Sequence, residues 1–245
     1  MKIFKLTFCI SLFLTLSTLF GSEPKPKSYD GCSELILEYL ARMESLAVPK
    51  VNKVYYIKYK IKTEFSKVLN TPNSETTTEV LTSKEKIMVI DKNMEVFGDD
   101  KNVFVVIPRN QKIFWNESDP IIYDNTNSYK RFVEIQKVVL ESASNIKCSS
   151  DNGITVITVT PGKEFSSKSN VILQTITYDN KLKKVLKVSS IYNDKSRIKK
   201  QTMVYEVLDF DSSKKIVAPI TALFKDNQLK DKYKGFEIID NRQKQ

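Results

Sequence analysis

The side chains that usually carry out catalysis or bind metals are scarce in this chain of 245 residues. It contains no histidine, which removes the commonest general base and the commonest metal ligand. Asp99 and Asp100 are neighbouring carboxylates, but they follow Gly98 in a turn-like stretch, so we interpret them as solvated turn residues. A nucleophile would need a lysine or a carboxylate as its base, and no Ser-x-x-Lys motif stands at a helix start. We therefore predict a protein that is not an enzyme and that uses no cofactor or metal.

Cysteine is the remaining reactive residue type, with three copies. Cys9 lies inside an N-terminal apolar run, too early for a lipoprotein anchor, and Cys32 lacks the small apolar residues expected before such an anchor. In an oxidising compartment, the pair Cys32 and Cys148 predicts one disulfide, with two buried free thiols as the alternative. Each cysteine flanks a predicted helix, so we expect the bond to tether a helical cover to the middle of a sheet.

The N-terminus predicts export. Lys2 and Lys5 precede an apolar run that ends at Phe20, and Gly21-Ser22 supply small residues. Residues 1–21 are typical of a cleavable signal peptide, and the alternative is an uncleaved anchor, for which the run is short. Residues 22–29 are rich in proline and lysine and are interpreted as a linker. Residues 30–241 are then expected to form a single domain.

One stretch, residues 54–65, must organise that domain. Its sequence alternates with a period of two, which predicts a long strand with an apolar face and a lysine-rich face. Such a strand belongs in an antiparallel sheet with one face in water. The apolar face is a wide aromatic floor that a packed core, a second sheet or a ligand must cover. It comprises Tyr55, Ile57, Tyr59, Ile61 and Phe65.

The other elements follow from the same periodicities. A helix capped by Asp30 or Ser33 is expected to run to about Ala47, with Ile36, Leu40 and Met43 on its apolar stripe. Helical spacing returns at 128–144, after a loop at 119–127, and Cys148 lies just past this helix. The segment 217–224 is apolar but ambiguous. Strands are predicted at 75–81, 86–97, 102–107, 112–115, 154–160, 171–178, 183–192, 201–210 and 236–240. The fold class is thus α+β, mainly β.

The net charge of +10 favours anionic partners such as phospholipid headgroups. Basic residues gather in the predicted hairpin between Lys181 and Lys200, where a membrane-surface patch and a merely solvated outer face are the two interpretations. Nucleic acid is not expected as a partner, because export removes the chain from it.

The order of elements resembles the LolA/LolB-like superfamily of periplasmic lipoprotein carriers. The local sequence is similar at Lys62–Ser66, at Met94–Phe104 and at Ile176–Val185, over a likeness spanning most of residues 30–240. The Pro-Gly-x-Phe-Arg-Trp-like strand of the well-known carriers has no counterpart here. The resemblance implies an open, strongly curved antiparallel sheet, or half-barrel, whose concave face is covered by amphipathic helices. It also implies a periplasmic location and acyl chains as cargo.

We therefore expect a monomeric carrier or binding protein for lipids or acylated lipoproteins, with membrane-surface or inner- and outer-membrane transport partners. The alternative is an exported structural or interaction module whose core is simply filled. The expected lining of the acyl cavity is Tyr55, Ile57, Tyr59, Ile61, Phe65, Ile36, Leu40, Met43, Met88 and Phe104.

Overall fold

The computed structural model describes residues 32–66, 71–118 and 128–242. The predicted signal peptide, the linker and the 119–127 loop lie outside these residues.

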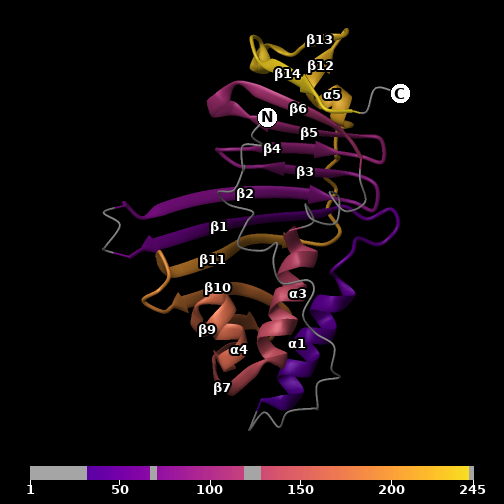
Figure 1. The fold of residues 1–245 in the computed structure, drawn as a ribbon. Coiled ribbons are helices and arrows are strands. Elements are labelled where there is room, and N and C mark those ends of the chain that lie inside the picture. Colours follow the sequence, from indigo (N-terminus) through magenta and orange to yellow (C-terminus); the bar gives the residue numbers. More distant parts are fainter. Residues whose placement is uncertain (1–31, 67–70, 119–127, 243–245) are drawn as a thin grey trace.

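Twelve strands form one open sheet (Figure 1). Its order is β14-β6-β5-β4-β3-β2-β1-β11-β10-β9-β8-β7, so β14 and β7 are its two edges. All neighbours pair antiparallel except β14, which runs parallel to β6. The predicted fold class is confirmed, with this one parallel pair making the sheet mixed. The strands are β1 Tyr55–Phe65, β2 Ser74–Thr82, β3 Ile87–Ile90, β4 Glu95–Gly98, β5 Asn102–Ile107, β6 Lys112–Glu117, β7 Ala143–Asp151, β8 Ile154–Pro161, β9 Val171–Asp179, β10 Lys184–Tyr192, β11 Ile198–Asp209 and β14 Glu237–Asp240.

Strand β1 lies in the middle of the sheet, between β2 and β11, and its two faces differ as its alternation predicts. Tyr55 and Ile57 are 2% and 1% exposed on the face that carries the helices, which we call the inner face. The lysines of the other parity lie on the outer face, where they form ion pairs with glutamates of β2 and β11. These pairs are Lys58 with Glu79 and Glu206, Lys60 with Glu75 and Glu206, and Lys62 with Glu75.

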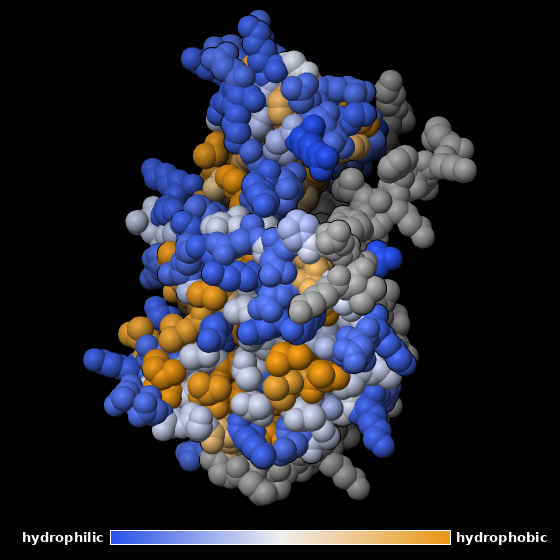
Figure 2. All heavy atoms as spheres, turned by 90° about the vertical axis from the view of Figure 1, so that its left-hand side faces the viewer, coloured by the Kyte–Doolittle hydropathy of each residue, from blue (hydrophilic) through white to orange (hydrophobic). Residues whose placement is uncertain are grey.

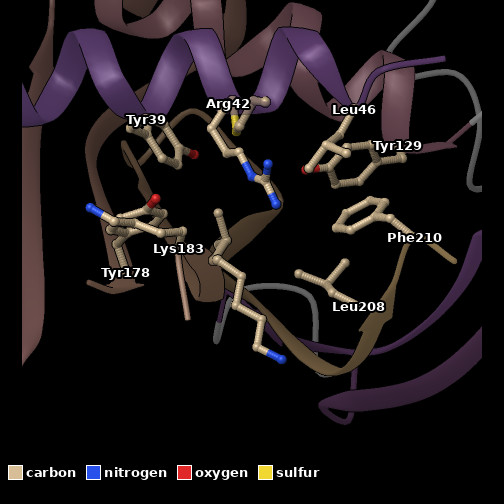
Figure 3. Close-up of a pocket in the computed structure, with 11 residues that line it drawn as sticks. Tyr39, Arg42, Leu46, Tyr129, Tyr178, Lys183, Leu208 and Phe210 are labelled. Atoms are coloured by element: carbon tan, nitrogen blue, oxygen red, sulfur yellow. The ribbon is translucent and has the colours of Figure 1, made fainter. Parts of the chain in front are cut away.

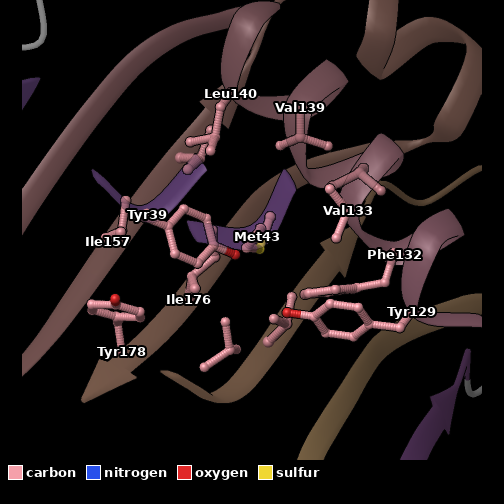
Figure 4. Close-up of a cluster of buried hydrophobic side chains, with 14 of the residues drawn as sticks. Tyr39, Met43, Tyr129, Phe132, Val133, Val139, Leu140, Ile157, Ile176 and Tyr178 are labelled. Carbon is pink, nitrogen blue, oxygen red and sulfur yellow. The ribbon is translucent and has the colours of Figure 1, made fainter. Parts of the chain in front are cut away.

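Two amphipathic helices lie side by side against the inner face of the lower half of the sheet (Figure 1). They are α1, Ser33–Ser45, and α3, Ser128–Glu141. Tyr39 and Met43 of α1 and Val133 and Leu140 of α3 point into one apolar cluster, the inner core (Figure 4). Ile36 of α1 is buried in the same cluster. The predicted covering of the apolar floor by helices is therefore present. A shorter helix, α4 Lys163–Ser169, precedes β9 and was not predicted.

Three predicted boundaries were wrong. The N-cap of α1 is Cys32, whose side chain makes no capping hydrogen bond, and not Asp30 or Ser33. The expected strand 86–97 is divided into β3 and β4, because the Asp91 carboxylate accepts hydrogen bonds from the amides of Asn93 and Met94 and so stabilises a turn. The helix expected to reach Ser144 ends at Glu141, and strand β7 follows directly. Strand β7 escaped prediction because its polar residues give no clear alternation.

A disulfide joins Cys32 and Cys148, as the cysteine count predicts, with Cα atoms 5.9 Å apart. Cys32 lies at the N-cap of α1, but Cys148 lies within β7. Because β7 is an edge strand, the bond ties the start of α1 to the edge of the sheet rather than to its middle.

The C-terminal segment covers part of the outer face. It contains α5 Pro219–Leu223, β12 Phe224–Lys225, β13 Gln228–Leu229 and the 3-10 helix η3 Asp231–Tyr233 before β14. Another 3-10 helix, η2 Pro108–Asn110, joins β5 to β6. The segment buries a second apolar set, the outer cluster: Phe97, Phe104, Val106, Ile113, Leu223 and Tyr233.

Candidate functional site

The aromatic floor continues onto neighbouring elements as a row of touching rings. Beyond β1, the row contains Tyr205 of β11, Phe210 directly after β11, and Tyr129 and Phe132 of α3. None of these four was among the predicted lining residues. The ring centroids are 5.0 Å apart for Tyr55–Phe210, 5.2 Å for Phe210–Tyr129, 6.0 Å for Tyr129–Phe132, 5.5 Å for Phe132–Tyr205 and 6.0 Å for Tyr205–Tyr59. The antiparallel register could have indicated Tyr205, which lies opposite Tyr59, had the β11 bulge been known.

The predicted lining residues divide into three groups. Ile36, Met43 and Ile57 are buried in the inner core, and Leu40 packs against its side. Tyr55 is buried beside Phe210.

Farther along β1, Tyr59, Ile61 and Phe65 are only half-buried. Ile61 lies opposite Met203, and Phe65 lies opposite Ile198. Here β1 and β2 extend past the two helices (Figure 1). Viewed from that side, the molecule gathers apolar side chains in its lower half (Figure 2). We call the part of the inner face formed by Tyr59, Ile61 and Phe65 the open end.

Met88 and Phe104 lie elsewhere, so their expected place in this lining was wrong. Val103 of β5 faces the inner core, and side chains alternate along a strand, so Phe104 faces the outer cluster. Met88 packs against the same outer cluster.

A small recess lies beneath α1, between the helix and the strands β9, β10 and β11 (Figure 3). Its cavity volume of about 10 Å³ is roughly that of one water molecule. Pockets for drug-sized ligands measure about 300–1,000 Å³. Over the middle of the floor, Tyr129 and Phe132 of α3 lie against Phe210 and Tyr205.

Polar atoms line this recess in an apolar setting. Tyr39 and Tyr178 are 0% and 1% exposed, and their hydroxyl oxygens have no hydrogen-bond partner among the residues that the structure describes. Burial raises the pKa of Tyr39 well above its ordinary value, and burial likewise raises the pKa of Tyr129. The nearby positive charge of Arg42 partly opposes the rise in the pKa of Tyr129 and of Tyr178. These phenols stay protonated at neutral pH and can act as hydrogen-bond donors.

The described residues contain no group of three or more histidine, cysteine, aspartate or glutamate side chains that could hold a metal ion. Over the same residues, no helix has the length and apolar character needed to cross a bilayer.

The basic residues predicted to form one patch are divided by the fold. Lys181 and Lys183 lie in the β9–β10 turn and Lys184 begins β10, whereas Lys195 lies in the β10–β11 turn and Lys199 lies near the start of β11, at the other end of β10. The two groups therefore do not form a continuous surface along one strand end.

No family model and no curated protein matches the sequence. Solved structures give similarities at low identity. A LolA superfamily protein from Nitrosomonas europaea has a TM-score of 0.32 and 11% identity, over 71% of this chain and 94% of that one. LprF from Mycobacterium bovis has a TM-score of 0.39 and 7% identity, over 81% and 99%. An uncharacterized conserved protein from Thermus thermophilus has a TM-score of 0.40 and 6% identity, over 84% and 99%.

A LolA superfamily protein, the kind of protein that the sequence resembles, is thus among the solved structures with low similarity to this chain. This chain has an open sheet that carries α1 and α3 on its inner face and α5 on its outer face. At these TM-scores the similarities transfer no ligand and no residue role to this chain.

Proposed function

We propose that this protein is a periplasmic carrier or binding protein that holds the acyl chains of lipids or acylated lipoproteins against the inner face. One observation carries the proposal: the apolar floor begins beneath α3 and continues along β1 to the open end. There Tyr59, Ile61 and Phe65 remain half-buried. An acyl chain laid on this strip would bury apolar surface that is continuous with the inner core. The resemblance of the local sequence points to the same kind of cargo.

Binding would begin at the open end and extend under α3. Phe132 and Tyr129 cover the middle of the floor, so a long chain must displace these rings or stop beside them. Met43 and Met203 border the path, and the unbranched, polarizable methionine side chain adapts to irregular spaces.

The test is an Ile61→Glu variant of the mature protein, assayed with a fluorescent fatty-acyl probe. Ile61 is half-buried, so in the free protein the new carboxylate can reach water and the fold should be retained. Under an acyl chain the same charge would be desolvated without a partner, which costs several kcal/mol. We expect a native far-UV circular dichroism spectrum and loss of probe uptake.

Thr77→Glu is the matched control. Thr77 lies opposite Lys60 on β1, and Lys60 is on the outer face. This variant adds the same charge to the same region of the sheet, so it should bind the probe as the wild type does. Loss of uptake in both variants would contradict a site on the inner face.

A second candidate is an exported structural or interaction module with a filled core. The cavity volume of about 10 Å³ favours it, as does the packing of Phe132 against Tyr205. The test uses folded wild-type protein. If it takes up no probe, and if mass spectrometry finds no lipid in its organic extract, the carrier proposal is contradicted and only this second function remains.

A further inference from the structure

The recess beneath α1 contains hydrogen-bond donors that the fold leaves unused. The hydroxyl of Tyr39 points into it from the helix, and that of Tyr178 points towards it from β9 (Figure 3). The two rings meet edge to face, with centroids 5.5 Å apart, so each holds the other in place. A buried hydroxyl without a partner costs about 1–3 kcal/mol, so two of them side by side call for an explanation such as a bound water molecule or ion.

A positive charge stands beside these donors. Arg42 extends from α1 into the same recess, between Tyr39 and Tyr129 (Figure 3). Within residues 32–66, 71–118 and 128–242, no carboxylate forms an ion pair with Arg42. Lys184 also lines the recess.

The acidic groups nearby are already engaged. Glu38 forms an ion pair with Lys183, 2.5 Å between Oε1 and Nζ. Asp179 accepts hydrogen bonds from the amides of Lys181 and Leu182 in the β9–β10 turn. Among the described residues, the exposed guanidinium of Arg42 thus lies beside two buried phenol donors without a carboxylate partner of its own.

We infer that this recess binds an oxoanion, the carboxylate or phosphate end of the acyl ligand. The inference rests on the proposed function and names the chemical class of ligand that the site would select. A guanidinium with phenol hydroxyls suits a carboxylate or phosphate, because hydrogen bonds to a charged acceptor are roughly twice as strong as neutral ones. The recess itself has room for about one water molecule, so the oxoanion would lie at its mouth, beside the exposed side chain of Arg42, while the chain lies along the floor. Arg42 and Tyr39 act through contact with the ligand, and a neutral end group would leave them unpaired.

One water molecule is the competing occupant, since it would fit the volume and could satisfy both hydroxyls. The Tyr39→Phe variant separates the two. Either occupant would lose a hydrogen bond in this variant. Only an oxoanion site makes the variant bind a carboxylate ligand more weakly.

The experiment compares laurate, its neutral methyl ester and inorganic phosphate, using calorimetry on the mature protein. Arg42→Gln should weaken laurate binding about tenfold or more and leave the methyl ester unchanged. Tyr39→Phe should weaken laurate several-fold with the same selectivity. Arg109→Gln is the matched control: it removes the same charged group from η2, between β5 and β6, and should change neither ligand.

Each outcome decides the matter. Equal affinity for laurate and its methyl ester, unaffected by Arg42→Gln, overturns the oxoanion site and leaves the acyl site standing. Phosphate binding that depends on Arg42, without binding of laurate or its methyl ester, would support the oxoanion site and contradict the proposed acyl carrier function. Absence of binding by all three compounds overturns both.

Discussion

Glu95 carries a buried carboxylate on the outer face, and two donors satisfy it. It is 5% exposed, and it accepts hydrogen bonds of 2.6 Å from Lys232 Nζ and 2.6 Å from Tyr233 Oη. Burial, and then the hydrogen bond to Glu95, raises the pKa of Tyr233, so this phenol remains a donor at neutral pH. The two hydrogen bonds fasten the C-terminal segment to β4.

Tyr233→Phe should therefore lower the free energy of unfolding by about 1–3 kcal/mol, because a buried carboxylate loses one of its donors. Urea denaturation followed by circular dichroism measures the change. Tyr56→Phe is the control, since its hydroxyl makes a longer bond of 3.3 Å to the partly exposed Glu79. If both variants lose the same amount of unfolding free energy, the hydrogen bond to Glu95 stabilises the fold no more than the longer bond to Glu79 does.

The disulfide is the second feature at the scale of single residues. Cys32 and Cys148 are 116 residues apart in sequence, so the bond restricts a long loop in the unfolded chain. Replacing both cysteines by serine should cost about 2–5 kcal/mol of unfolding free energy. Reductant should lower the stability of the wild type to that of the double variant and leave the variant unchanged. A wild type that is insensitive to reductant would contradict this.

Among the elements, the C-terminal segment forms a unit of its own, because it packs on the outer face and not in the inner core. The chain offers a natural reporter of it. The single tryptophan, Trp115, packs against the outer cluster, where Phe104 lies 4.9 Å away between ring centroids. Arg242 stacks over this indole, 3.4 Å from the ring centroid.

Leu223→Ala should loosen this segment, since Leu223 is 0% exposed in the outer cluster, and such truncations cost about 2–5 kcal/mol. We expect the unfolding transition seen by tryptophan fluorescence to move to lower urea concentration. Ile220→Ala lies on the same helix but Ile220 is 40% exposed, so its effect should stay within about 0.5 kcal/mol. A fluorescence transition that does not move in Leu223→Ala would show that the segment does not shield Trp115.

The sequence predicted elements where periodicity was strong and local. The alternation of β1 gave its faces, and the stripe of α1 gave Ile36 and Met43 in the core. Prediction from the sequence failed where the position of a residue or strand depends on pairing with strands that are distant in the sequence. Which face Phe104 occupies depends on the number of residues in the β3–β4 and β4–β5 turns, and β14 pairs with β6 across more than a hundred residues. The rings that complete the aromatic row come from α3 and β11, so only the tertiary fold brings them to β1.

At the scale of the whole molecule, the sheet separates two apolar clusters and one charged surface. The inner face carries α1 and α3, the outer face of β4–β6 carries the C-terminal segment, and the outer face of β1, β2 and β11 carries lysine–glutamate pairs. Exposed pairs of this kind contribute little stability each, so the fold depends mainly on the two clusters. At the open end, apolar surface continues out of the inner core along a central strand, which is why we place ligand binding there.

The tyrosines of the inner core give the whole molecule a pH dependence. Burial raises the pKa of Tyr39, Tyr129 and Tyr205, and it raises the pKa of Tyr192 to about 12. In the unfolded chain these groups titrate near pH 10. Above that pH the unfolded state loses protons that the folded state keeps, so stability is fully present below about pH 10 and is lost as the pH rises further.

We expect the free energy of unfolding to fall by up to about 1.4 kcal/mol per pH unit for each such tyrosine. The raised pKa of Lys60, caused mainly by Glu206, acts in the same direction. Urea denaturation across the alkaline range measures the slope, while tyrosinate absorbance reports whether ionisation and unfolding coincide. Tyr192→Phe removes one of these groups, so its slope should be shallower than that of the wild type. Tyrosine ionisation that is complete before the circular dichroism signal changes would show that the phenols are open to solvent in the folded state, contrary to this packing.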